Sequence, residues 1–126
     1  MPKQTVFTNN APAAIGTYSQ AVRAGNTVYL SGQIALHPQT MELVDDSSDA
    51  QIRQVFDNLA AVAAAAGATL ADVAKLTVYL ADLDDFAVVN KIMKEYFSEP
   101  YPARVAIGVG NLPKGAAVQI DAILVV

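Results

Sequence analysis

The sequence contains no cysteine, no tryptophan and a single histidine. Without cysteine, the chain can form neither a disulfide nor a zinc–thiolate site, and it offers no thiol nucleophile. His37 lies in the polar segment 37–40, a context typical of a solvent-exposed loop histidine rather than a catalytic one. A zinc site would therefore need three carboxylates, and no spacing in the sequence suggests such a set. We expect no bound metal.

Charged residues are also scarce, at 16% of the chain, and the formal net charge is −4. Lysine and arginine are scattered, so no basic patch is available for phosphate groups, and nucleic acid is not an expected ligand. No apolar run approaches the roughly 20 residues that a membrane-spanning helix needs. The segment 1–10 lacks the apolar stretch of a signal peptide. We therefore expect a soluble, cytoplasmic protein.

The chain has 126 residues, enough for one domain with a substantial core but too few for two. We see no linker, repeat or block of charge, so the domain is expected to be continuous over residues 1–126. The hydrophobic fraction, 53%, is high for this size. Two explanations remain open: a buried contact between copies of the chain, or the alanine-rich segment 59–66, which inflates the count.

Local patterns predict six strands and two helices. Ser48 and Gln51 fit a capping box that begins the first helix, which Gly67 ends. Asp84 and Asp85 open the second helix, and the segment EPYP at 99–102 forces the chain out of it. The expected strands are 4–8, 19–24, 27–34, 73–81, 103–109 and 117–125. Helices placed between strands imply an α+β fold, a mixed sheet with both helices on one face.

Alternation within the strands gives each an aliphatic face for the helices and a second, mixed face. In the fifth strand, Val105 and Ile107 are expected on the aliphatic face, opposite Arg104 and Ala106. In the other strands the mixed face carries residues such as Tyr29, Tyr79, Ile123 and Val125. This face either packs against another copy of the chain around a wet cleft, or it is a half-exposed sheet.

The segment YPARVAIGVG at 101–110 places one guanidinium among small and aliphatic residues. Arginine is a rigid fork that suits a planar carboxylate, and the small neighbours Ala106 and Gly108 leave room beside it. The alternative is a surface arginine paired with one of the twelve acidic residues. If the last strand pairs antiparallel with the fifth, Gln119 and Asp121 fall on the side of Arg104. Such a site would bind a small carboxylate and water without a metal or redox group.

Four segments together resemble the RidA, or YjgF-like, family of enamine/imine deaminases: NAPAAIGTYSQAV at 10–22, VYLSGQI at 28–34, DLDDFAVVNKIMKEYF at 82–97 and YPARVAIGVGNLPKGAAVQIDAI at 101–123. The resemblance covers nearly the whole chain, as a single RidA-like domain. It implies a chorismate-mutase-like fold and a homotrimer with helices outside and clefts between subunits. It also implies cofactor-free hydrolysis of 2-aminoacrylate and 2-iminopropanoate, which leak from pyridoxal-phosphate enzymes, to 2-oxo acids and ammonia.

Residue by residue, the resemblance assigns Arg104 to the arginine that binds the substrate carboxylate. It assigns Tyr18, Ser31 and Asn90 to positions that line the cleft, with Tyr18 closing the pocket. Ala106 falls where many members have cysteine; the family uses the backbone carbonyl at this position to place water, so alanine should serve.

Gln119 departs from the family, which has a glutamate there that holds and helps to activate the water. A glutamine carbonyl accepts a hydrogen bond but the side chain cannot take a proton, and loss of a positioned base typically costs about 10²–10⁴-fold in rate. Asp121 could substitute, although its reach is shorter. Two functions therefore remain: a cofactor-free deaminase of small imino acids, or a non-catalytic binding module for small 2-oxo carboxylates. A third option, a role in protein or RNA interaction, has no electrostatic support in this acidic chain.

Overall fold

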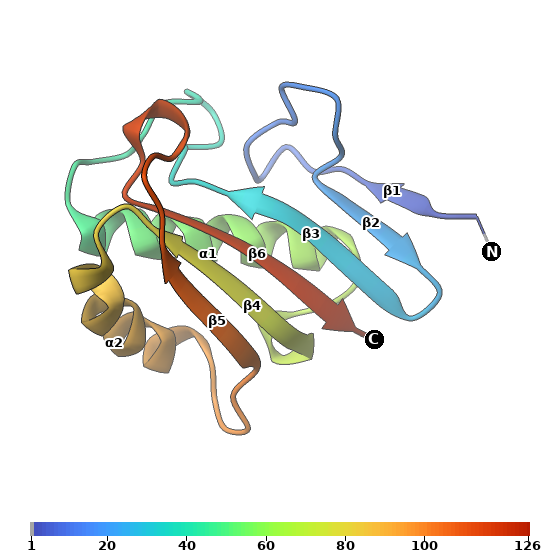
Figure 1. The fold of residues 1–126 in the computed structure, drawn as a ribbon. Helices are drawn as coiled ribbons and strands as arrows, with labels where there is room; N and C mark the ends of the chain where they lie inside the picture. Colours follow the sequence, from blue (N-terminus) through green and yellow to red (C-terminus); the bar gives the residue numbers. More distant parts are fainter. Residues whose placement is uncertain (1) are drawn as a thin grey trace.

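A computed structural model describes residues 2–126 of the chain. Its strands form one mixed sheet in the order β1–β2–β3–β6–β4–β5. The sheet is built from β1 (Gln4–Val6), β2 (Ala21–Ala24), β3 (Thr27–Gln33), β4 (Val73–Leu80), β5 (Ala103–Gly108) and β6 (Val118–Val125). The helices α1 (Ser48–Ala65) and α2 (Phe86–Tyr96) lie on the same face of the sheet (Figure 1). The predicted α+β architecture, with a six-stranded mixed sheet and two helices, is confirmed.

The core lies between α1 and the helix-facing side of the central strands. Apolar residues recur along α1 at helical spacing, and this stripe packs on the sheet. Fully buried members include Ile52, Val55, Phe56, Leu59 and Val62 from α1, with Leu76, Val78, Leu80, Ile120 and Leu124 from β4 and β6. Each such side chain contributes about 1.5–3 kcal/mol by leaving water.

The start of α1 differs from the prediction by one residue, because Ser47 rather than Ser48 is the N-cap. The Ser47 hydroxyl accepts a hydrogen bond from the Ala50 amide at 3.1 Å. Ser48 instead donates to Asp85 at 2.7 Å. Gln51 is not part of a capping box: its side chain donates to the Asp45 carbonyl and accepts from the Ala117 amide. The predicted box is therefore wrong, and Gln51 ties the start of α1 to the segment before β6.

The face assignment of β5 is also wrong. In the parallel register with β4, Arg104 lies opposite Leu76 and Ala106 opposite Val78. Because paired residues on neighbouring strands point to the same face, Arg104 and Ala106 face the helices. Val105 and Ile107 consequently lie on the open face, where they are 41% and 42% exposed. The open face is thus more apolar than the alternation suggested.

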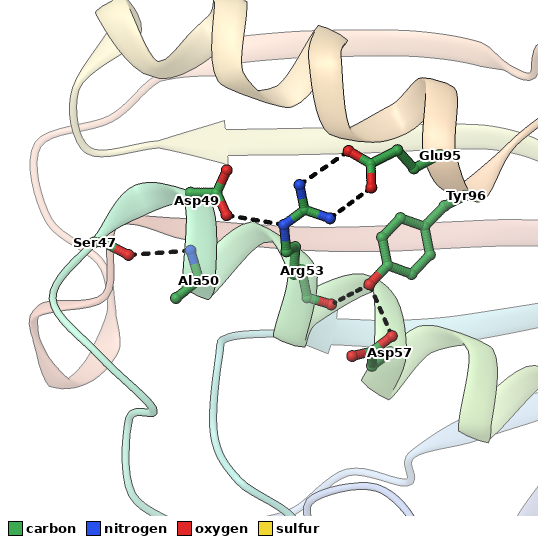
Figure 2. A network of polar contacts seen from close by, with 7 residues as sticks. All are labelled: Ser47, Asp49, Ala50, Arg53, Asp57, Glu95 and Tyr96. Atoms are coloured by element: carbon green, nitrogen blue, oxygen red, sulfur yellow. Dashed lines mark hydrogen bonds and ion pairs between the residues drawn. The ribbon is translucent and has the colours of Figure 1, made fainter.

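A polar network fixes α2 beside α1 (Figure 2). Arg53 of α1 donates to Asp49 at 2.8 Å and forms a two-pronged pair with Glu95 of α2 at 2.7 and 2.9 Å. The Tyr96 hydroxyl lies 2.9 Å from an Asp57 carboxylate oxygen and 3.3 Å from the Arg53 carbonyl oxygen. Its ring packs against Phe56 at a centroid distance of 5.2 Å. Exposed ion pairs add little stability, so the network mainly sets the position of α2.

Tyr96 gives this network a pH dependence. Partial burial, followed by the hydrogen bond to Asp57, raises the pKa of Tyr96 to about 12. A phenol whose pKa is higher in the folded than in the unfolded state contributes fully below about pH 10, and that contribution is lost as the pH rises toward 12. We expect Tyr96→Phe to lower the free energy of unfolding by about 1 kcal/mol at neutral pH.

The same substitution should make stability fall less steeply between about pH 9 and pH 11.5. Urea denaturation at several pH values, with both proteins measured side by side, gives the two slopes. Parallel slopes for wild type and variant would show that Tyr96 does not hold its proton more tightly in the folded state.

Candidate functional site

Apart from Ala106, the sequence-predicted site residues lie around two separate cavities. The first, here the Gln119 cavity, has a volume of about 440 Å³ and includes Tyr18, Ser31, Gly32 and Gln119 in its lining. The second, here the Arg104 cavity, has a volume of about 460 Å³ and is lined by Asn90, Met93, Lys94, Tyr101, Pro102 and Arg104. The two linings share no residue. A single chain therefore brings Arg104 and Asn90 together, and Tyr18, Ser31 and Gln119 together, but it does not join the two groups.

The strand order explains this separation. Between β6 and β5 lies β4, so the last strand does not pair with the fifth as assumed from the sequence. Gln119 lies opposite Tyr79 and Asp121 opposite Thr77 in the β4–β6 register. These residues point to the open face, whereas Arg104 points to the helix side. The expected placement of Gln119 and Asp121 on the side of Arg104 is therefore wrong.

Arg104 is held by one face of α2. Its Nη1 donates to the Asn90 side-chain oxygen at 2.6 Å and lies 3.4 Å from the Met93 sulfur. Its guanidinium carbon lies 4.8 Å from the centroid of the Phe86 ring, a cation–π contact. Phe86, Asn90 and Met93 follow one another at helical spacing, so a single face of α2 forms the whole cradle.

No carboxylate neutralises Arg104 within residues 2–126, where the ion pairs belong to Arg53. The alternative of an arginine paired with an acidic side chain of its own chain is therefore not what the structure has. Asn90 occupies Nη1, and among residues 2–126 the edge formed by Nε and Nη2 has no protein acceptor. That edge matches the two oxygens of a carboxylate, so the arrangement is suited to a planar anion.

In the Gln119 cavity, Gly32 makes room for Gln119. A Cβ atom at position 32 would collide with the Nε2 atom of Gln119, so only glycine lets this amide lie over the strand. The Ser31 hydroxyl donates to the Ser19 carbonyl, and the Ser31 amide donates to the Gln20 carbonyl at 3.0 Å. Tyr18 is 51% exposed. The polar lining of the cavity thus includes the Gln119 amide, two hydroxyls and the side chain of Lys114. The amide and the hydroxyls can hold water, but none of them is a base that takes its proton.

Asp121 is engaged with Tyr79 instead of Gln119. The Tyr79 hydroxyl donates to an Asp121 carboxylate oxygen at 3.2 Å. The negative charge of Asp121, more than partial burial, raises the pKa of Tyr79. Asp121 does not line either cavity.

The remaining sequence-predicted residues carry no separate site. The Ala106 side chain is half-buried against the core and lines neither cavity. His37 is exposed, and its Nδ1 accepts from the Gln39 amide at 3.1 Å within a turn. Over residues 2–126 there is no cluster of His, Cys, Asp or Glu side chains that could hold a metal ion. Within the same part of the chain, no helix combines the length and apolarity that a membrane crossing requires.

The sequence patterns did not assign Phe86, Met93 and Lys94, which surround Arg104, to the site. They also did not indicate Lys114 of the Gln119 cavity. Phe86 and Met93 lie on the face of α2 that also carries Asn90 and contacts Arg104. Their spacing to Asn90 was the available signal, but it could be used only once Arg104 was known to face α2.

This geometry defines a class of protein: a small α+β protein in which a positioned arginine can bind an anion. Comparisons with known proteins identify the family. The family model described as endoribonuclease L-PSP matches residues 8–126. The chain is similar to RidA of the Antarctic bacterium Psychrobacter sp., with 54% identity, a TM-score of 0.95 and coverage of 98% and 99% of the two chains.

It is also 46% identical over 125 residues to the 2-iminobutanoate/2-iminopropanoate deaminase of Dermatophagoides farinae, covering 99% of this chain and 98% of the relative. TdcF of E. coli, solved with bound serine, superposes with a TM-score of 0.93 at 40% identity, and the match covers 98% of both chains. The chain belongs to the RidA, or YjgF-like, family.

The cradle of Arg104 predicts the effect of a one-atom change. Asn90→Asp keeps the shape of the side chain but places a carboxylate where the amide oxygen lies 2.6 Å from Arg104. This internal anion should compete with any carboxylate ligand and weaken binding of pyruvate about tenfold or more. The folded state should not lose stability, because a new ion pair replaces a neutral hydrogen bond.

Calorimetric titration with pyruvate and thermal unfolding of both proteins measure the two quantities. Asn90→Ser is the matched control, since it shortens the acceptor without adding charge. Unaltered pyruvate affinity in Asn90→Asp would show that Arg104 is not the anion receptor.

Proposed function

We propose that the protein is a cofactor-free deaminase that hydrolyses small 2-imino and enamine acids, such as 2-aminoacrylate and 2-iminopropanoate, to 2-oxo acids and ammonia. The observation that carries this proposal is Arg104, which α2 holds on one side and which has no carboxylate partner within residues 2–126. The deaminase named among the relatives supports the same reaction class. The task is to remove intermediates released by pyridoxal-phosphate enzymes, in the cytoplasm where those enzymes work.

The proposed working form is a homotrimer with a chorismate-mutase-like arrangement, helices outside and a cleft at each subunit interface. Two features support it. The open face of the sheet exposes four large side chains, Tyr29, Val105, Ile107 and Val125. Exposed apolar surface of this kind is typical of an interface with another protein chain. The site residues also divide between two cavities, so a second copy is needed to bring a Gln119 cavity against an Arg104 cavity.

In the proposed mechanism, the Nε–Nη2 edge of Arg104 binds the substrate carboxylate and fixes the imine carbon in the cleft. Water is held by the Ala106 carbonyl and the Gln119 side chain, and Tyr18 closes the pocket. The water oxygen adds to C2 of the protonated imine and loses a proton to solvent. The amino nitrogen then takes up a proton and leaves as ammonia with the electrons of the C–N bond, while the hydroxyl loses its proton and becomes the carbonyl, so imine plus water gives 2-oxo acid plus ammonia.

A coupled assay tests this proposal. A serine/threonine dehydratase generates the imine, and its conversion to the 2-oxo acid is followed with and without the protein. Wild type should accelerate the conversion, while Arg104→Ala should reduce both the acceleration and pyruvate binding by at least tenfold. Arg104→Lys keeps the charge but not the planar guanidinium, so it should recover only part of the acceleration and part of the pyruvate binding. An Arg104→Ala protein as active as wild type would contradict the proposal.

A second function is favoured by one specific observation: no ionisable side chain stands at position 119, and Asp121 is occupied by Tyr79. The chain would then be a binding module for small 2-oxo carboxylates. Gln119→Glu separates the two. If wild type binds pyruvate without accelerating imine decay, and Gln119→Glu gains about 10²-fold or more in rate, the binding module is correct. If wild type is active and the variant gains only a few-fold, the deaminase is correct.

The composition of this chain does not support the endoribonuclease activity in the description of the family. Phosphate backbones are bound by clusters of basic residues, and the formal net charge here is −4 with twelve acidic residues. We therefore do not propose RNA as a substrate.

A further inference from the structure

The Arg104 cavity carries a second cation that the proposed reaction does not use. Lys94 lines it together with Arg104, and the other lining residues are Asn90, Met93, Tyr101 and Pro102. None of these is acidic, although the chain as a whole has four more acidic than basic residues. Within residues 2–126, neither Lys94 nor Arg104 takes part in an ion pair. The cavity is therefore positively charged against the trend of the molecule.

Helix geometry places Lys94 on the same face of α2 as the residue that holds Arg104. Asn90, which holds Arg104, and Lys94 are four residues apart on α2, so they lie one above the other on the same face. One helical turn advances about 5.4 Å, which sets the ammonium roughly one turn beyond the amide that fixes the guanidinium. A ligand bound to Arg104 through one end can thus extend toward Lys94 with the other.

The size of the cavity agrees with a longer ligand. In the single chain its volume is about 460 Å³ and it is open to solvent, so a ligand longer than a three-carbon acid has room. Positive potential with no internal counter-charge selects for negative charge on the ligand.

We propose that Lys94 is a specificity residue that binds a second acidic group, so that the site prefers 2-imino and 2-oxo acids with an anionic side chain. This inference rests on the proposed function, in which Arg104 binds the carboxylate next to the reacting carbon. The simpler role for Lys94 is to offset the dipole at the C-terminal end of α2, where it lies in the last turn. That role would leave ligand preference untouched.

The test compares two probes of similar length, 2-oxoglutarate and 2-oxopentanoate, which differ in the charge at the far end. Wild type should bind 2-oxoglutarate about three- to fivefold more tightly, the range that one exposed ion pair supplies. The preference should shrink as ionic strength rises. Lys94→Gln should bring the two acids to equal affinity.

Lys91→Gln is the matched control, because Lys91 is an exposed lysine of the same helix that does not line the cavity. It removes the same charge and should keep the preference. Equal affinity of wild type for both acids, or an equal loss of preference in the two lysine variants, would overturn the role of Lys94. Failure of the proposed function is recognised separately, since Arg104→Ala would then bind both acids as wild type does.

Discussion

The hydrogen bond between Arg104 and Asn90 joins the edge strand of the sheet to α2, and the functional account depends on it. A guanidinium that is half-buried beside a helix normally needs a partner, and here the partner is a neutral amide at 2.6 Å. A carboxylate in the same place would have neutralised the arginine and closed it to ligands. The amide orients Arg104 without consuming its charge, so the charge stays available to an anion.

The position of α2 is in turn fixed by its contacts with α1. Two contacts lie between the helices (Figure 2): the bidentate pair of Arg53 with Glu95, and the hydrogen bond from the Tyr96 hydroxyl to Asp57. Met93 is buried in the core and also contacts Arg104, so the same residue packs α2 on the sheet and helps to position the guanidinium. An anion site can therefore lie at the edge of a small sheet because the helix beside it is held in its last turn by α1 and through Met93 by the core.

Much of the fold could be predicted from the sequence, because the apolar periods of 2 and 3.6 residues are strong in this chain. The apolar residues from Ile52 to Val62 recur at helical spacing and are buried, and Gly67, predicted to end the first helix, follows α1 with a φ of +77°. Alternation failed at β5 because an edge strand has one face on the helices and one open face, and the aliphatic residues Val105 and Ile107 took the open one. A pattern of alternation fixes which residues share a face, but not which face turns inward.

The candidate site could be predicted only in part, because local patterns do not determine how the strands pair or which face turns inward. The fork at Arg104 stands out among small residues, and the family resemblance supplies Tyr18, Ser31, Asn90 and Gln119. That these residues fall into two cavities depends on β4 lying between β6 and β5, a long-range pairing that no local pattern encodes. The choice of Ser47 over Ser48 as N-cap was likewise undetermined, since either hydroxyl can accept from an amide three residues on.

The central claim is that a working site combines the Arg104 cavity of one copy with the Gln119 cavity of another. The most direct measurement mixes two inactive variants, Arg104→Ala and Tyr18→Ala/Gln119→Leu, by unfolding them together and refolding. Random assembly into rings pairs an intact half with an intact half at about one interface in four, so about a quarter of the wild-type deaminase activity should return. Arg104→Ala mixed with Asn90→Asp, both damaged in the same half, should restore none. No recovery in the first mixture, from variants that fold and assemble, would contradict a site shared between copies.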